Sequence, residues 1–377
     1  MKRQHKKRPL KPQPNIRARR STPSPRKNSR GALGVLTGGG DCPGLNAALR
    51  AVVKGASRAG YTVFGVLEGF KGLYENNMTE LQPFDVSGII SMGGTLLGTS
   101  RFNPFKHPKT RQVLQANLKK RGIQGLVTIG GEGTQRCAFE LNQIGIPCVG
   151  VPKTIDNDVY GTDFTFGFDT AVSIATEAID RLHTTAESHN RIMLVEVMGR
   201  HTGWIATYSG IAGGADAVLI PEQKFSLKRL IEILEHRRKM GKKFSIIVVS
   251  EDAKVVVDTD GNKPHLLQTP MHQDEYGNLK LGGITYLLED ALRKRTDMEV
   301  RSTILGYIQR GGSPTPRDRV LATRLGLVAV DLAIKGKYGY MVGLKGTAIK
   351  SIPLSRVVKR LKRVDKKIYQ VAEAFFD

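Results

Sequence analysis

The chain of 377 residues has few cysteines, few aromatic residues and no long apolar run. Its three cysteines, Cys42, Cys137 and Cys148, have spacings that match neither a metal site nor a disulfide framework. We therefore expect reduced packing thiols and a cytoplasmic location. The apolar stretches are soon interrupted by Gly, Lys or Asp, so we expect no membrane span.

Acidic residues are absent from residues 1–30, which hold twelve Lys or Arg and five prolines and so carry half of the net charge of +24. This composition predicts a disordered basic tail. A targeting segment, a contact with nucleic acid or another anionic surface, and a solubilising extension all remain open for it. Residues 31–377 also carry a net positive charge, which suits an enzyme with an anionic substrate. The alternative to an enzyme is a non-catalytic protein that binds anions or nucleic acid.

From residue 32 onward, short β-branched runs alternate with longer helical patterns. Strands are predicted at 33–36, 62–67, 125–129, 148–151, 191–197, 244–249 and 302–307, and helices at 46–59, 111–120, 134–144, 170–185, 227–240 and 284–294. The alternation indicates an α/β fold with parallel sheets, and the length favours two domains. A ligand site is expected where the strands end, because open α/β sheets bind ligands there.

The first strand runs into the glycine-rich turn 38–44. Consecutive glycines let backbone N–H groups approach a phosphate, and Pro43 suits the first turn of a helix whose positive end faces the anion. The turn is neither a Walker loop, since Leu45 replaces the required Lys, nor a dinucleotide fingerprint. Either a phosphate cradle or a plain tight turn explains it.

A second turn, 130–134, contains Glu132 between glycines and ends at Thr134. Glu132 could hold Mg²⁺ against phosphates, or it could simply favour a helix N-terminus. Thr134 is predicted as the N-cap.

A third turn, 152–158, carries two carboxylates. If this stretch is extended, Thr154, Asp156 and Asp158 lie on one side of the backbone. Repulsion between the two carboxylates would raise one pKa and suit a general base. A polar Asx-type turn is the alternative.

Arginines accompany the predicted strand ends, and their planar forks match phosphate oxygens. They are Arg101, Arg191, Arg200, Arg301 and Arg310. We expect these five on a shared sheet edge.

Six motifs in order make the chain similar to the phosphofructokinase family. They are GGGDCPGLNA (38–47), IGGEGT (129–134), PKTIDND (152–158), EVMGRHTG (196–203), IPE (220–222) and ILGYIQRGGSPTPRDR (304–319). The resemblance extends from about residue 32 to about residue 345.

The resemblance implies two Rossmann-like α/β domains of the phosphofructokinase fold. Residues 31–167 plus about 309–350 would form the larger, nucleotide-binding domain, and 168–308 plus about 351–377 the smaller, sugar-phosphate-binding domain. The implied reaction is the glycolytic transfer of a phosphoryl group from ATP to the 1-hydroxyl of fructose 6-phosphate, with Mg²⁺. A homodimer or homotetramer with shared sugar-phosphate sites is also implied.

The resemblance further implies roles for individual residues. Nucleotide contacts fall to Gly40, Arg101, Phe102, Gly131, Glu132, Gly133 and Thr134, with Glu132 at the metal. Asp156 would be the base, helped by Thr154, Asp158 and Arg200. The sugar phosphate would meet Thr154, Asp156, Met198, Gly199, Arg200, Glu222, Tyr307 and Arg310, with Arg191 and Arg301 arriving from the adjacent subunit.

Two positions concern the phosphoryl donor. Gly133 resembles ATP users, because an Asp there would repel the α-phosphate of a nucleotide, whereas Lys153 resembles pyrophosphate users. The combination is similar to a branch whose members are generally ATP-dependent. We therefore expect ATP, with pyrophosphate as the alternative. Glu132 stands where many members of the family carry Asp, and its longer side chain still suits Mg²⁺. Tyr307 stands where the best-known bacterial members have His, and its hydroxyl can still donate to a phosphate.

Overall fold

The computed structural model describes residues 29–259, 262–267, 272–273, 279–280 and 282–376. Residues 1–28 of the predicted tail lie outside this range, so their disorder stays a prediction. The expected end of the tail at Arg30 is wrong by two residues. Arg30 N donates to Gly60 O (3.0 Å), and Thr62 N donates to the Ser29 hydroxyl (3.2 Å). These bonds fix residues 29 and 30 to the folded part.

No helix in the described residues is long and apolar enough to cross a membrane.

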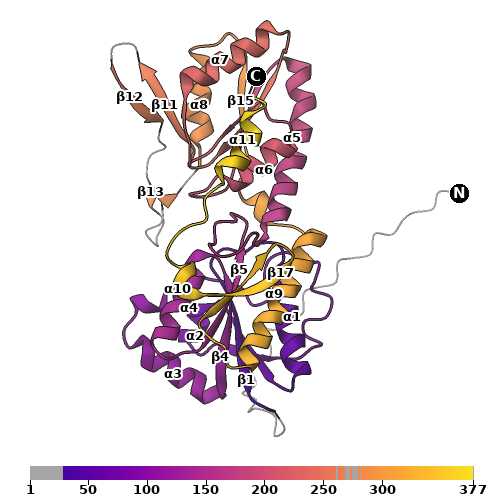
Figure 1. Cartoon of the computed structure of the whole chain (residues 1–377), viewed down its shortest axis with the longest axis vertical. Coiled ribbons are helices and arrows are strands. Elements are labelled where there is room, and N and C mark those ends of the chain that lie inside the picture. Colours follow the sequence, from indigo (N-terminus) through magenta and orange to yellow (C-terminus); the bar gives the residue numbers. More distant parts are fainter. Residues whose placement is uncertain (1–28, 260–261, 268–271, 274–278, 281, 377) are drawn as a thin grey trace, which may run out of the picture.

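A first unit is built on a sheet with the strand order β17-β16-β5-β4-β1-β2-β3, in the lower half of Figure 1. Its central strands are parallel, and both edge strands, β3 and β17, are antiparallel. The strands are β1 (Ala32–Gly38), β2 (Thr62–Val66), β3 (Met78–Leu81), β4 (Ile123–Gly130), β5 (Cys148–Thr154), β16 (Tyr340–Lys345) and β17 (Ala348–Pro353), and the short β6 (Phe166–Gly167) pairs with β5.

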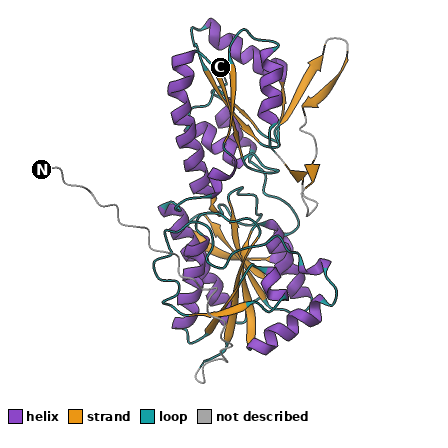
Figure 2. Cartoon of the chain, turned by 180° about the vertical axis from the view of Figure 1, so that it is seen from behind, coloured by secondary structure: helices purple, strands orange, loops and turns teal. Residues whose placement is uncertain are grey.

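Helices cover both faces of this sheet, as Figure 2 shows. Leu33 and Val35 of β1 share a core with α1 (Leu45–Arg58) and α9 (Pro316–Ile334), whereas Ala32 and Leu36 share another with α3 (Thr110–Arg121) and α4 (Glu132–Gln143). The period of two along the strand therefore decides which helix each residue meets. The unit also holds α2 (Phe70–Tyr74), η2 (Pro104–Lys106) and α10 (Leu354–Val357).

A second unit is built on the parallel sheet β15-β7-β10-β8. Its strands are β7 (Ile192–Val197), β8 (Ala217–Leu219), β10 (Ser245–Ser250) and β15 (Val300–Ile304). Its helices are α5 (Phe168–His189), α6 (Trp204–Ala212), α7 (Leu227–Lys239), α8 (Ile284–Arg293) and α11 (Lys366–Glu373). Smaller sheets join β9 (Lys224–Ser226) to β11 (Lys254–Thr259) and β12 (Asn262–Leu267), and β13 (His272–Gln273) to β14 (Leu279–Lys280).

The predicted α/β class with parallel sheets is confirmed, and three details differ. The strand expected over 302–307 ends at Ile304, because Gly306 (φ 49°) turns the chain into the 3₁₀ helix η3 (Gly306–Arg310). Thr134 is no N-cap, since Gly131 holds that position. The chain was expected to return to the second unit near residue 351, but β17 continues to Pro353 and α10 packs on α4.

Candidate active site

Three turns lie side by side at the carboxyl edge of the first sheet. Gly38 at the end of β1 pairs with Gly130 at the end of β4, and Gly130 pairs with Pro152 of β5. This register brings the two glycine-rich turns and the 152–158 turn together. The alternation of strands and helices predicted a ligand site at the ends of the strands.

Glycine lets the first turn of α4 pack closely on these strand ends. A Cβ on Gly130 would lie 2.2 Å from Thr134 Oγ1, and a Cβ on Gly38 would lie 2.6 Å from the same oxygen. Thr134 is therefore a buried packing residue between the two turns. Gly133 differs, because no atom lies within 4 Å of its Cβ position.

Asp156 is partly buried in a turn and not in an extended segment. Strand β5 ends at Thr154, whose hydroxyl accepts from Asp156 N (3.1 Å), and Asn157 adopts a left-handed conformation (φ 51°). The expectation of an extended 154–158 stretch is therefore wrong. Desolvation raises the pKa of the Asp156 carboxyl, while the nearby charges of Arg310, Arg200 and Lys153 oppose the rise.

Asp158 is buried, and its Oδ1 has no hydrogen-bond partner within the described part of the chain. Burial raises the pKa of Asp158 to about 7, and the charges of Asp156 and Glu132 add to the rise. Three carboxylates from two turns therefore act on one another. A bound cation would relieve this repulsion.

The carboxylates fit a Mg²⁺ ion that arrives with phosphates. Glu132 begins α4, and its Oε1 accepts from Arg136 Nη2 (2.7 Å) and Nε (3.1 Å). No group of three His, Cys, Asp or Glu among the described residues could hold a metal alone. Mg²⁺ commonly takes only one or two protein carboxylates and completes its shell with water and phosphate oxygens. Glu132 and Asp158 meet that need.

Lys153 ties the third turn to the first. Its side chain is buried, and Nζ donates to the carbonyl oxygen of Gly40. Burial lowers the pKa of Lys153. This lysine therefore places a cation beside both the glycine-rich turn and Asp156.

The carboxyl edge of the second sheet supplies the opposite wall. Ser250 at the end of β10 pairs with Val197 at the end of β7, so Glu251 lies beside the 198–200 loop. Glu251 Oε1 accepts from Arg200 N (2.9 Å) and Gly199 N (3.4 Å). Burial raises the pKa of Glu251 to about 7, and the Asp156 charge contributes.

Sequence reasoning missed Glu251. The available signal was its position two residues after the strand predicted at 244–249, at the edge where ligands bind.

Direct contacts join the two walls. Arg310 Nη2 donates to Asp41 Oδ1 (2.7 Å), and the Thr202 hydroxyl donates to Asp156 O (3.2 Å). A Cβ on Gly40 would lie 2.1 Å from Arg310 Nη2, so a larger residue there would displace the guanidinium from its present place. The guanidinium carbon of Arg310 lies over the Tyr307 ring, 5.6 Å from the ring centroid.

Arg101, Phe102 and Met198 lie on the loops around these contacts. Thr99 just before Arg101 donates to Gly39 O (2.6 Å), and the Phe102 ring stacks on His107 at 4.2 Å between centroids. Met198 N donates to Gln309 Oε1 (3.3 Å), which joins the β7 loop to η3.

Glu222 holds backbone groups together at the edge of the site. Its carboxylate accepts from Gly203 N (3.0 and 3.2 Å) at the start of α6 and from Val364 N (3.0 Å) in the C-terminal segment.

Two of the five predicted arginines lie elsewhere. Arg191 precedes β7 and Arg301 is the second residue of β15, and both pair with Glu299. They occupy the amino end of the second sheet, about 20 Å of strand away from Met198. The expected shared edge is therefore wrong for this pair, because parallel strands carry their first residues at the opposite end.

Comparison with known proteins identifies the family that shares this arrangement. The family model described as phosphofructokinase matches residues 32–333. The chain belongs to the phosphofructokinase family. One relative, the pyrophosphate–fructose 6-phosphate 1-phosphotransferase of Streptomyces coelicolor, is 49% identical over 91% of this chain and 99% of its own. Another, the ATP-dependent 6-phosphofructokinase of Chloroflexus aurantiacus, is 48% identical over 88% of this chain and 92% of its own.

A solved structure, the phosphofructokinase of Saccharomyces cerevisiae, superimposes with a TM-score of 0.77 at 31% identity, over 92% of this chain and 50% of that chain. The predicted phosphofructokinase fold is thus confirmed. The prediction of a phosphotransferase enzyme is also confirmed, against the alternative of a non-catalytic binding protein. Relatives with either donor match it about equally well, so family membership does not select the donor.

Proposed function

We propose that this enzyme transfers the terminal phosphoryl group of ATP to the 1-hydroxyl of fructose 6-phosphate, giving fructose 1,6-bisphosphate and ADP. The Asp156 carboxylate carries the proposal. It is partly buried where the two sheets meet, and the charges of Arg310, Arg200 and Lys153 act on it. A carboxylate with a raised pKa accepts a proton well, and the surrounding cations suit phosphate groups.

In the proposed reaction Asp156 takes the proton of the 1-hydroxyl as that oxygen attacks the phosphorus atom. Thr154 holds the turn through its bond from Asp156 N, and Arg101 and Arg200 balance charge on the transferring group. Glu132 and Asp158 would hold Mg²⁺, which neutralises phosphate charge when bound.

ATP is the donor that we favour. The open space at Gly133, with no atom within 4 Å of its Cβ position, leaves room for the phosphates of a nucleotide beside α4. Gly40, Gly131, Thr134 and Phe102 would complete the nucleotide contacts.

Pyrophosphate is the second candidate, and Lys153 is the observation that favours it. The buried ammonium lies against the Gly40 carbonyl, where it could face the second phosphate of a short donor. The relative from Streptomyces coelicolor bears a pyrophosphate-dependent name.

The sugar phosphate would lie against the second sheet. Met198, Gly199, Glu222, Tyr307 and Arg310 would contact it from the same chain. Arg191 and Arg301 would come from a second copy in a homodimer or homotetramer, which their place at the amino end of the sheet favours. We also propose a cytoplasmic enzyme.

The test measures turnover of fructose 6-phosphate with ATP and with pyrophosphate for the wild type and Asp156→Ser. We expect turnover with ATP, and a fall in kcat of about 10²- to 10⁴-fold in the variant with little change in KM for the sugar. Asp331→Ser, at an exposed aspartate of α9, is the matched control and should match the wild type. Preserved kcat with weakened affinity in Asp156→Ser would remove Asp156 as the base, and turnover with pyrophosphate alone would reverse the choice of donor.

A further inference from the structure

The chain leaves the first unit after α10 and passes between the two units as residues 358–365, here termed the C-terminal strap. Lys362 N donates to Asp158 O (2.8 Å), and Leu361 forms a β-bridge with Val159. Two residues further on, Val364 N donates to Glu222 (3.0 Å). The strap thus touches both the 152–158 turn and the second unit.

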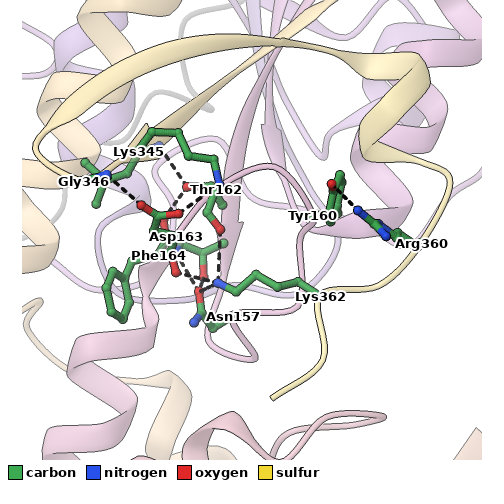
Figure 3. Close-up of polar contacts among 11 residues, drawn as sticks. Asn157, Tyr160, Thr162, Asp163, Phe164, Lys345, Gly346, Arg360 and Lys362 are labelled. Atoms are coloured by element: carbon green, nitrogen blue, oxygen red, sulfur yellow. Dashed lines mark hydrogen bonds and ion pairs between the residues drawn. The ribbon is translucent and has the colours of Figure 1, made fainter. Parts of the chain in front are cut away.

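The Lys362 side chain reaches back into the loop that follows the turn, as Figure 3 shows. Its Nζ donates to Asn157 Oδ1 (2.9 Å), Thr162 O (3.1 Å) and Asp163 O (2.5 Å). An ammonium has three N–H donors and no acceptor, so three oxygens satisfy it completely. The three oxygen acceptors around Nζ therefore match the three donors of an ammonium group.

Aromatic rings lie around the same ammonium. Lys362 Nζ is 4.8 Å from the Trp204 ring centroid and 5.8 Å from that of Phe164, and Trp204 Nε1 donates to Lys362 O (2.8 Å). Trp204 begins α6, so Lys362 connects the turn with a helix of the second unit.

Burial lowers the pKa of Lys362 to about 7, so placing the charge here costs free energy. The charges that act on it are those of Asp163 and Asp158, which oppose the shift, and of Lys345, which reinforces it. Lys345 Nζ and Gly346 N bind the Asp163 carboxylate at 2.9 and 2.7 Å, which leaves Lys362 to the uncharged oxygens. The oxygens and rings offset the cost.

Asn157 is the residue that needs support. It is fully buried, it stands between Asp156 and Asp158, and its φ of 51° lies in the left-handed region, which asparagine adopts more readily than most other non-glycine residues. Its Oδ1 accepts from Lys362 Nζ (2.9 Å), from Thr165 N (3.0 Å) and, at 3.5 Å, from the Thr165 hydroxyl. Removing Lys362 would take away the only charged donor among these three.

We propose that Lys362 is a positioning residue, which acts through Asn157 to hold the turn that presents the Asp156 carboxylate and links that turn to α6 of the second unit. The inference rests on the proposed role of Asp156 as the base. In the described part of the chain, the Lys362 side chain bonds to none of the residues proposed to contact the sugar, so its effect should appear in kcat and not in sugar affinity.

The experiment compares Lys362→Met with Lys345→Met in the full-length enzyme. Both replace a lysine that binds the loop 160–165, but only Lys362 touches Asn157. We expect Lys362→Met to lower kcat by about 10- to 100-fold, since a small misplacement of a reacting group has such effects. KM for fructose 6-phosphate should stay within about twofold, because sugar contacts remain. Lys345→Met should keep both constants.

Hydrogen exchange of residues 154–165 gives a readout that needs no activity. Exchange should accelerate in Lys362→Met and not in Lys345→Met, and the emission of Trp204, the single tryptophan of the chain, should change only in Lys362→Met. If the wild type turned over neither donor, the proposed reaction would fail while these readouts still tested the strap.

Unchanged exchange together with unchanged kcat in Lys362→Met would overturn the inference. Should that variant not fold, Asn157→Ala removes the acceptor that Lys362 Nζ and Thr165 share. It should reproduce the loss of kcat at constant KM, and wild-type kcat in Asn157→Ala would equally overturn the inference.

Discussion

Arg310, at the end of η3 in the second unit, is held by Asp41 in the first glycine-rich turn. Nη2 donates to Asp41 Oδ1 (2.7 Å), Nε donates to Asp41 O (3.2 Å), and only 13% of the arginine side chain is exposed. The largely buried guanidinium of Arg310, near Asp156, is thus held in place by the Asp41 carboxylate. A phosphate could take over the place of Asp41 on the same donors.

Replacing Arg310 should therefore weaken the binding of the sugar phosphate. Arg310→Ala is expected to raise KM for fructose 6-phosphate by about 10- to 100-fold, since a charged hydrogen bond contributes about 1.5–3 kcal/mol. Steady-state kinetics over a wide sugar range measures the change. Arg324→Ala, at an exposed arginine of α9, is the control, and an unaltered KM in Arg310→Ala would refute the phosphate contact.

A carboxylate at position 133 should change the donor without disturbing the fold. The Cβ position of Gly133 has no atom within 4 Å, and its backbone is not left-handed, so Gly133→Asp should keep the wild-type Tm. Turnover with ATP should fall by more than about tenfold, because the new charge repels a nucleotide phosphate. Gly133→Ala adds only a methyl group and should retain turnover with ATP. Equal ATP turnover in both variants would disprove the nucleotide contact at Gly133.

The acid limb of the pH profile should respond to Glu251. As a base, Asp156 is active when ionised, so kcat should rise as the pH passes its raised pKa. The Asp156 charge raises the pKa of Glu251, and because repulsion between two carboxylates is mutual, the Glu251 charge should oppose ionisation of Asp156. Glu251→Gln removes one charge and keeps an acceptor for Arg200 N, so the pKa of Asp156 should fall and the limb should move to lower pH. We would measure kcat from pH 5 to 9, with Asp331→Asn as control, and a limb that stays or moves upward would contradict the coupling.

Asp318 should stabilise the contact between α9 and α5. It is buried, and its Oδ2 accepts from Thr170 N (2.9 Å) and the Thr170 hydroxyl (2.6 Å). Asp318→Ala would leave these donors unpaired and should cost about 2–4 kcal/mol of unfolding free energy. Urea unfolding measures the loss. Asp331→Ala on the exposed face of α9 should cost under about 1 kcal/mol, and a similar small cost for Asp318 would argue against a structural role.

The local signals were sufficient for the three turns of the first unit. Glycine runs at strand ends predict close approach of backbone, and the ends of parallel strands share one edge of a sheet, as the Gly38–Gly130 and Gly130–Pro152 pairs show. The prediction that residues 154–158 are extended was wrong, because Asn157 takes a left-handed conformation that its buried contacts support. No periodicity reports such contacts.

Two other site residues escaped sequence reasoning for a related reason. The role of Glu251 depends on Gly199 and Arg200 in the loop after the neighbouring strand, and that of Lys362 depends on Asn157 far away along the chain. One charged residue after a strand, or one lysine in a basic segment, resembles many surface residues until its partners are known.

Composition and motif order by themselves determined the α/β class, the family and the glycine-lined edge, since these depend on backbone freedom and hydrophobic periodicity, which are local properties. Only the tertiary structure decided which charges meet. It separated Arg191 and Arg301 from the edge that holds Asp156, joined Arg310 to Asp41, and placed the ammonium of Lys362 beneath the turn. These outcomes depend on strand direction and on contacts between distant segments, because electrostatic and hydrogen-bond partners are set by distance in space and not by separation along the chain.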